Sequence, residues 1–183
     1  MQKIMMMAVL ISGLFLAGSI EAQTNKLITK NSVGKVKIGM TLAQVRKTLG
    51  PLTLGKAEAA SEGDMSYPIK QGKNLVMTIV IGGGASLKGK VAEIMVLDRS
   101  YKTADGVHVG MLLSEAEKKY GQIKEISDDM EMEMVTFTNQ PEGFSFTLAG
   151  SGKGKLAGIY DKDDQTATKY HAGAKLKSIE ITY

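Results

Sequence analysis

The sequence predicts an α+β fold: two tandem repeats, each a helix followed by an antiparallel meander, packed as one body after an N-terminal signal peptide. Three observations predict it. An almost uncharged apolar run opens the chain, one motif recurs in the second half, and stretches that alternate apolar and polar residues follow each copy. The expected boundaries are a signal peptide at 1–22, a first repeat at 23–103, and a second repeat at 104–183 with a long inserted loop at 150–175.

The first 22 residues have the three parts of a secretory signal peptide. Lys3 supplies the positive charge, Ile4–Ile20 is the apolar run, and Ala22 is a small residue suited to the cleavage edge. A retained membrane anchor is the alternative, but the run is short for a spanning helix and contains two glycines. We therefore expect cleavage, no stable membrane anchor afterwards, and a periplasmic or secreted protein.

Internal similarity is the strongest signal in the rest of the chain. Val36–Leu42 has the same pattern as Val107–Leu113, and the match continues through the next helical turns to a glycine. A second pair of segments closes each half, because Lys90–Leu97 has the same pattern as Lys175–Thr182. Self-similarity of this kind indicates repeated supersecondary units.

Each repeat is predicted to begin with a helix of two to three turns. Thr41 with Gln44, and Ser114 with Glu117, have the spacing of a capping box at a helix start. Apolar residues follow at helical spacing. Each helix is predicted to end at a left-handed glycine, Gly50 in the first repeat and Gly121 in the second.

Strands are predicted from the alternation of apolar and polar residues that follows each helix. In the first repeat they cover 65–69, 75–81 and 91–97. In the second they cover 130–138, 144–148 and 176–183. Such alternation favours an antiparallel sheet with one face covered by the core and the other face exposed to solvent.

The repeated motif also carries a resemblance. It reads V-x-I-G-M-T-x-x-x-V-x-x-x-L-G from Val36 and G-V-x-V-G-M-L-x-x-E-x-x-x-x-Y-G from Gly106. This unit resembles the small repeat of BamE/SmpA-type outer-membrane assembly proteins and of the β-lactamase inhibitor protein, which implies the same helix-on-meander fold in both halves. The chain has two repeats, unlike BamE-like lipoproteins, and neither Cys nor Trp, so the functional residues of neither family are carried over.

Composition excludes several classes of function. Without cysteine the chain has no disulfide, no thiolate metal site, no thiol nucleophile and no lipid attachment of the lipoprotein type. The net charge of +4 is spread along the chain without a basic run and interleaved aromatics, which argues against nucleic-acid binding. No catalytic motif is present, so we expect a protein that is not an enzyme and has no cofactor.

A methionine stripe is the most unusual short stretch. In a strand, Met130, Met132 and Met134 point to one face, and Glu131 and Glu133 point to the other. The favoured interpretation is that the methionines fill the core face while the glutamates face water. The alternative is a Cu(I) site made by the three thioethers, because soft ligands suit a soft ion. The apolar residues that follow are in phase with the glutamates, so a bulge or two partly covered faces is expected.

The loop at 150–175 carries the leading functional hypothesis, because long loops on a rigid scaffold are common binding sites. We predict a non-enzymatic binding protein of the cell envelope that contacts an envelope or secreted protein through a sheet face and this loop. A tolerated insertion is the alternative for the loop, and a carrier of a small apolar ligand, bound between helices and sheet, is an alternative function. The candidate contact residues are Lys153, Lys155, Tyr160, Asp161, Tyr170 and His171.

Overall fold

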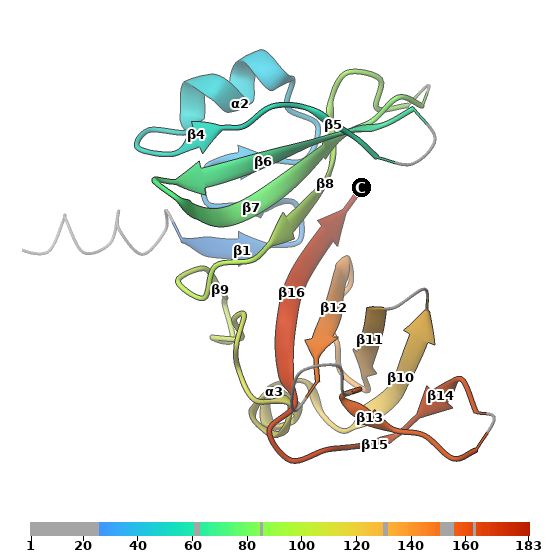
Figure 1. Cartoon of the computed structure of the whole chain (residues 1–183). Helices are drawn as coiled ribbons and strands as arrows, with labels where there is room; N and C mark the ends of the chain where they lie inside the picture. The colour runs from blue at the N-terminus through green and yellow to red at the C-terminus, as the bar shows by residue number, and fades with distance from the viewer. Residues whose placement is uncertain (1–25, 61–62, 85, 130–131, 151–155, 163) are drawn as a thin grey trace, which may run out of the picture.

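The computed structural model describes residues 26–60, 63–84, 86–129, 132–150, 156–162 and 164–183. These residues form a small α+β body that is mostly β-sheet, with the two helices α2 (Leu42–Thr48) and α3 (Leu113–Tyr120) (Figure 1). The predicted signal peptide lies outside the described residues. Among the residues that are described, no helix is long and apolar enough to cross a membrane.

A ten-stranded sheet runs through both halves of the chain. Its strand order is β14-β10-β11-β12-β16-β8-β7-β6-β4, and β5 pairs with β6 off this path. The strands are β4 (Thr53–Leu54), β5 (Glu58–Ala59), β6 (Met65–Gln71), β7 (Asn74–Ile81), β8 (Val91–Val96), β10 (Ile123–Asp129), β11 (Met132–Phe137), β12 (Phe144–Ala149), β14 (Thr166–Ala167) and β16 (Lys175–Thr182).

Two smaller sheets accompany it. One has the order β3-β2-β1-β9, in which β1 and β9 are parallel. The other joins β13 to β15 within the 150–175 loop. Their strands are β1 (Leu27–Thr29), β2 (Ser32–Val33), β3 (Val36–Lys37), β9 (Lys102–Thr103), β13 (Gly158–Ile159) and β15 (Lys169–Tyr170).

The last strand of the chain makes the two meanders one continuous sheet. β16 pairs antiparallel with β8, and Ile179 lies opposite Val96 while Ile181 lies opposite Ile94. Figure 1 shows β16 reaching from the lower half of the molecule to the C-terminus beside the upper strands. All four side chains are fully buried, so the join is made of apolar cross-strand pairs.

The predicted strands are present, with ends that differ by a few residues, but β10 was missed, as were the short strands of two or three residues. The sequence of β10 is mostly polar, and of its side chains whose burial is described only those of Ile123 and Ile126 are buried. β10 lies next to the edge of the sheet, where only the short β14 covers it. A strand near an edge needs few apolar residues, so alternation in the sequence is weak there.

The start of α2 confirms the predicted capping box. The Gln44 amide donates to the Thr41 hydroxyl at 3.3 Å, and the Thr41 amide donates to the Gln44 side chain at 2.8 Å. The box predicted at Ser114 is wrong, because α3 begins at Leu113 and Ser114 lies inside the helix. The Leu113 amide instead donates to the Ala174 carbonyl at 2.9 Å, so a backbone group just before β16 satisfies the start of this helix.

The same pair of backbone hydrogen bonds occurs before each helix. The Gly39 amide donates to Val91 at 2.8 Å, and the Val91 amide donates back to Met40 at 2.8 Å. Before α3, Gly110 donates to Leu176 at 2.8 Å, and the Leu176 amide donates to the residue after Gly110 at 3.0 Å. Both glycines have a left-handed backbone, with φ of +83° and +81°. These bonds tie the segment before each helix to the strand that ends its half.

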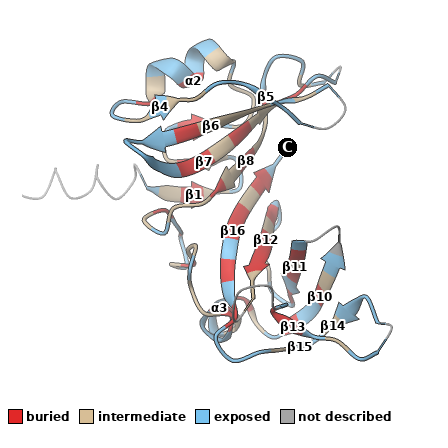
Figure 2. Cartoon of the chain, viewed as in Figure 1, coloured by how far each residue is buried: buried red, intermediate tan, exposed pale blue. Residues whose placement is uncertain are grey.

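The hydrophobic core joins buried residues of the large sheet to buried residues of the two helices and of the small sheet β1–β3, and Figure 2 marks the buried residues in red. In the second half Tyr120 of α3 packs against Phe137 and Phe146, with ring centroids 6.0 and 5.7 Å apart. The Tyr120 hydroxyl donates to Thr103 of β9 at 2.8 Å. A buried tyrosine of this kind fills the core and satisfies its polar end at the same time.

Gly39→Ala and Gly110→Ala are each expected to lower the free energy of unfolding by about 1 kcal/mol, because a left-handed backbone is strained once a Cβ is present. The added Cβ meets no atom within 4 Å at either position, so the cost is conformational alone. Urea denaturation measures it. Gly84→Ala is the control, since Gly84 has equal space and no positive φ. A cost at only one of the two glycines would contradict the equivalence of the two turns.

Candidate functional site

The face of the sheet opposite the core carries two rows of cross-strand neighbours. Directly opposite residues of antiparallel strands share a face, so the register defines each row. Their ten residues are Ser145, Glu180, Met95, Thr78 and Pro68 in the first row, and Thr182, Glu93, Val80, Ser66 and Glu58 in the second. None of them is fully buried. We call these ten residues the acidic face, because they include three glutamates and no lysine or arginine.

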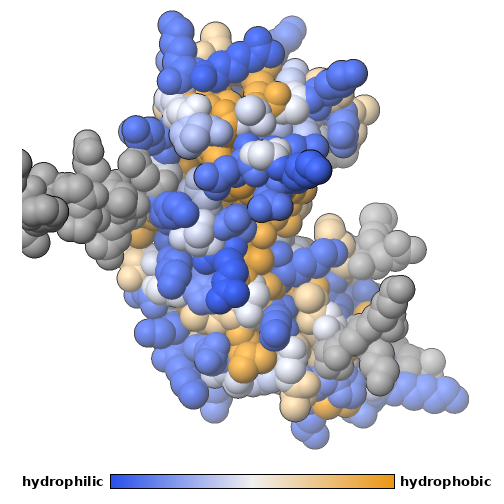
Figure 3. All heavy atoms as spheres, turned by 60° about the vertical axis from the view of Figure 1, so that its left-hand side comes forward, coloured by the Kyte–Doolittle hydropathy of each residue, from blue (hydrophilic) through white to orange (hydrophobic). Residues whose placement is uncertain are grey.

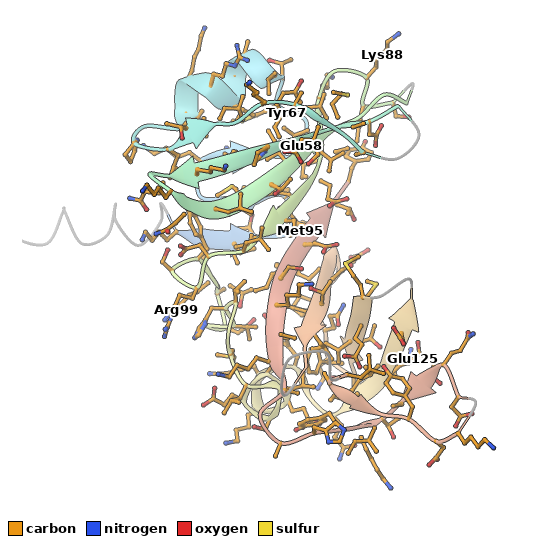
Figure 4. The ribbon with its side chains drawn as sticks, viewed as in Figure 1. Glu58, Tyr67, Lys88, Met95, Arg99 and Glu125 are labelled. Atoms are coloured by element: carbon orange, nitrogen blue, oxygen red, sulfur yellow. The ribbon has the colours of Figure 1, made fainter. Side chains whose placement is uncertain are left out.

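The position of the acidic face can be followed in Figure 4, where Glu58 is labelled in the upper half and Met95 at the junction with β16. Five strands contribute to each row, from both halves of the chain. Most of the side chains are half-buried, while Thr182 and Glu58 are exposed. A negative centre on a chain with a net charge of +4 is the main electrostatic contrast of this surface.

Glu93 and Glu180 are the two central carboxyls of the acidic face. They lie on the neighbouring strands β8 and β16, in adjacent rows. Burial raises the pKa of the Glu93 carboxyl, and the negative charges of Glu180 and Asp64 raise it further. Burial also raises the pKa of Glu180, while a hydrogen bond from Ser178 lowers it. The fold therefore holds two carboxylates where ionisation is costly and where no cation of the two rows offsets them.

A chain of hydroxyls orients Glu180. The Ser178 hydroxyl donates to the Glu180 carboxylate at 3.1 Å, and it lies 2.6 Å from the Thr147 hydroxyl. Because Ser178 uses its proton on Glu180, Thr147 is the donor in the second bond. Thr147 and Ser178 are both buried, so this chain holds one carboxylate oxygen in a fixed direction.

A third carboxyl stands beside the acidic face. Asp64 accepts a hydrogen bond of 2.6 Å from the Gly83 amide, which links the two ends of the β6–β7 hairpin region. Its charge contributes to the raised pKa of Glu93. Within the described residues, no three His, Asp or Glu side chains lie close enough together to hold a metal ion.

The methionine stripe is oriented opposite to the favoured interpretation. Glu133 is 6% exposed and shares the core face with its neighbour Val135, while Met132 is 44% exposed and Met134 is half-buried on the other face. The bulge expected after the methionines is not needed, because Glu133, Val135 and Phe137 all lie on the core face of β11. Met130 and Glu131 lie outside the described residues. The Cu(I) hypothesis stays a prediction.

Glu133 is buried because it binds the backbone of the long loop. Its carboxylate accepts hydrogen bonds from the Ala157 amide at 2.5 Å, the Gly158 amide at 2.7 Å and the Tyr160 hydroxyl at 2.9 Å. Three donors compensate for the lost hydration of the charge. The favoured interpretation failed because a loop more than twenty residues away supplies these donors, which no pattern around the methionines indicates.

The loop is also tied to α3. The Tyr170 hydroxyl donates to Glu117 at 2.5 Å, and the His171 amide donates to the Ala157 carbonyl at 2.8 Å. Burial and these acidic partners raise the pKa of Tyr170 to about 12, and raise that of Tyr160 as well. Both phenols therefore remain protonated donors at neutral pH.

The predicted contact residues of the loop differ in whether their side chains turn inward or are exposed. Tyr160 and Tyr170 turn their hydroxyls inward, whereas Asp161 and His171 are exposed. Lys153 and Lys155 lie outside the described residues. Because Glu133 is on the core face, its loop partners lie on the helix side of the sheet, opposite the acidic face. The loop and the acidic face are therefore two separate surfaces.

Sequence analysis missed the acidic face. The one available signal was a glutamate inside each of the two closing strands, Glu93 in β8 and Glu180 in β16, each directly between two apolar residues. A single glutamate on the wet side of a strand is common. Only the pairing of β8 with β16 brings the two together.

The sequence matches the model of a protein family over residues 21–170, and that family is described as Protein of unknown function (DUF1131). The chain belongs to this family. The fold is similar to the crystal structure of the uncharacterized protein yfeY from Escherichia coli, with a TM-score of 0.57 at 20% identity. The match covers 85% of this chain and 99% of that chain, and at this identity it concerns the fold alone. No protein with a curated function matches the sequence.

Glu133→Gln is expected to lower the free energy of unfolding by about 2 kcal/mol, because an amide nitrogen then faces a backbone amide and the charge-assisted bonds are lost. Urea denaturation measures this loss. Limited proteolysis should cut first near 156–162, since the bonds to Ala157 and Gly158 hold that segment. Glu125→Gln, at an exposed position on β10, is the control. Unchanged proteolysis would contradict the anchoring role.

Glu93→Gln and Glu180→Gln are expected to raise stability at neutral pH. The folded-state pKa of each carboxyl lies above the ordinary value of 4.5, so folding favours the protonated form. The associated stabilisation is complete below pH 4.5 and is lost as the pH rises through the folded-state pKa. Each variant should therefore gain in urea midpoint at pH 7 and lose that gain at pH 4. Glu142→Gln, in an exposed turn, is the control.

Proposed function

We propose that this chain is an exported, non-enzymatic binding protein of the cell envelope, and that its acidic face binds a basic segment of another protein. One observation carries the proposal: Glu93 and Glu180 stand together on an open sheet face with raised pKa values and no basic side chain in their rows. An arrangement that costs stability in the free protein is expected where a partner relieves it.

The chemistry of the partner follows from this electrostatics. A lysine or arginine side chain placed between Glu93 and Glu180 removes their mutual repulsion and restores hydrogen bonds to both carboxylates. Half-buried carboxylates are screened less by salt than exposed ones, so such a contact is stronger than an ordinary surface ion pair. The oriented Glu180 carboxylate favours arginine, because the paired N–H donors of the planar guanidinium group need an acceptor in a fixed direction.

The 150–175 loop provides a second contact surface, separate from the acidic face. It is anchored by Glu133 and Glu117 on the helix side, so its exposed residues Asp161 and His171 serve a second contact surface. Separation of the two surfaces allows each to be altered without the other.

Export and tandem repetition are further parts of the proposal. The three-part N-terminal segment at 1–22 supports export by a cleaved signal peptide. The equivalent bonds of Gly39 and Gly110 to β8 and β16 support two repeats of one unit, with the boundaries 23–103 and 104–183. The resemblance of the repeated motif to BamE/SmpA-type proteins and the β-lactamase inhibitor protein remains part of the proposal at the level of the fold alone.

Glu93→Lys combined with Glu180→Lys is expected to abolish capture of a partner from envelope extract, because it reverses the charge at the centre of the acidic face. Captured proteins are compared by quantitative mass spectrometry at low and high salt. Partners of the unaltered chain should be retained at low salt and released at high salt.

Two controls separate this surface from general charge effects. Glu142→Lys makes the same kind of charge change in an exposed turn outside the acidic face and should leave capture intact. Asp161→Lys alters the loop alone. Urea midpoints confirm that all variants fold. If the acidic-face variant captures the same proteins as the Glu142 control, the proposed surface is wrong.

A further inference from the structure

A cleft opens on the side of the molecule away from the acidic face, between the C-terminal end of α2 and the small sheet of β1, β2 and β3. Its volume is about 200 Å³. Half of the residues that line it have large apolar or aromatic side chains: Val33, Val36, Leu49, Leu52, Met77 and Tyr101. In Figure 3, apolar surface is visible among the charged side chains of this upper half.

A tight turn after α2 forms part of the cleft wall. α2 ends at Thr48 with Leu49 as its C-cap, and Gly50 continues with a left-handed backbone at φ +57°. The chain then turns back through Pro51, and the Leu52 amide donates to the Leu49 carbonyl at 3.0 Å. The side chains of Leu49 and Leu52, at the two ends of this tight turn, both line the cleft.

Tyr101 supplies the only long polar side chain that is almost fully buried in the wall. It is 7% exposed, and among the described residues its hydroxyl makes no hydrogen bond. Burial and the charge of Asp98 raise the pKa of Tyr101, so the hydroxyl is a protonated donor at neutral pH. An acceptor atom of a ligand in the cleft can accept a hydrogen bond from this hydroxyl.

Two cations border the cleft, since Lys26 and Lys35 are exposed and line it. Among the described residues no carboxylate lines the cavity, although the charge of Asp98 acts on Tyr101. An apolar wall with two cations at its mouth suits a ligand with an apolar body and an anionic head. Lysine ammonium groups on flexible stems reach such a head without a fixed geometry.

The volume limits the size of the ligand. An apolar cavity of about 150 Å³ holds one benzene ring. The cleft is slightly larger and opens to solvent. It therefore accepts about one aromatic ring or a short branched chain, but not the acyl chain of a phospholipid.

We propose that this cleft is a binding site for a small free carboxylate with an apolar body of about one aromatic ring. The ring lies against Leu49, Leu52 and Met77. The carboxylate lies at the mouth near Lys26 and Lys35, where the Tyr101 hydroxyl donates to the ligand. This site is independent of the acidic face and does not require that the proposed function be correct.

The test uses 3-phenylpropanoate as the probe and its neutral amide as the matched ligand, with the full chain and titration calorimetry at low salt. The carboxylate is expected to bind about tenfold more tightly than the amide, since hydrogen bonds to charged groups are the stronger ones. Added salt should narrow this difference. No saturable binding of the carboxylate up to millimolar concentration would overturn the proposal, as would equal affinities for the two ligands.

Variants assign the contacts. Lys26→Gln combined with Lys35→Gln should weaken the carboxylate about tenfold and leave the amide unchanged, whereas Lys37→Gln, an exposed lysine of β3 outside the cleft, should change neither. Tyr101→Phe removes one hydroxyl and should cost about fivefold. An effect of the lysine pair no larger than that of Lys37→Gln would contradict the site.

A filled cleft completes the test. Leu52→Phe extends a half-buried wall residue into the cavity and should prevent binding of both ligands, while the urea midpoint shows that the variant folds. If it does not fold, the polar variants above still decide the outcome. Binding to vesicles of anionic phospholipid without binding of the soluble probe would assign the lysines to a lipid surface and overturn the proposal.

Discussion

The register between β8 and β16 is the constraint on which the rest of the structure depends. Ile179 opposite Val96, and Ile181 opposite Ile94, place the apolar side chains of two meanders on one face. A shift of one residue would turn every side chain of one meander to the other side of the sheet. The same register that buries the isoleucines sets Glu180 beside Glu93 on the opposite face. Core and acidic face are therefore two consequences of one pairing.

Two kinds of carboxylate follow from this arrangement. Glu133 points into the helix side, where the backbone of the loop supplies enough donors to satisfy its charge. Glu93 and Glu180 point to the open side, where only Ser178 donates to one of them among the described residues. Glu133 holds the loop to the sheet. Glu93 and Glu180 leave unsatisfied charge on a surface, which is why we assign binding to the acidic face and anchoring to Glu133.

Prediction from the sequence succeeded where the pattern was local. The capping box of Thr41 and the left-handed glycine after each helix need only neighbouring residues, and both are present. Prediction failed where a distant segment supplies the partner. Ser114 is not a cap because Ala174 satisfies the helix end, and Glu133 is buried because a loop binds it. β10 was missed because a strand near the sheet edge carries too few apolar residues to be recognised.

The sequence alone determined which reactive groups the chain contains and where its local elements form. The absence of cysteine excludes disulfides and thiolate sites, and the two glycine-containing motifs with the alternating strands predict an α+β fold. Tertiary structure alone decided that the two meanders share one sheet and that Met132 and Met134 lie on the face opposite the core. It also decided which acids meet and where the cleft with Tyr101 opens. Periodicity reports which side of a strand a residue is on, but strand pairing decides what lies beside it, since the paired residues are far apart in the chain.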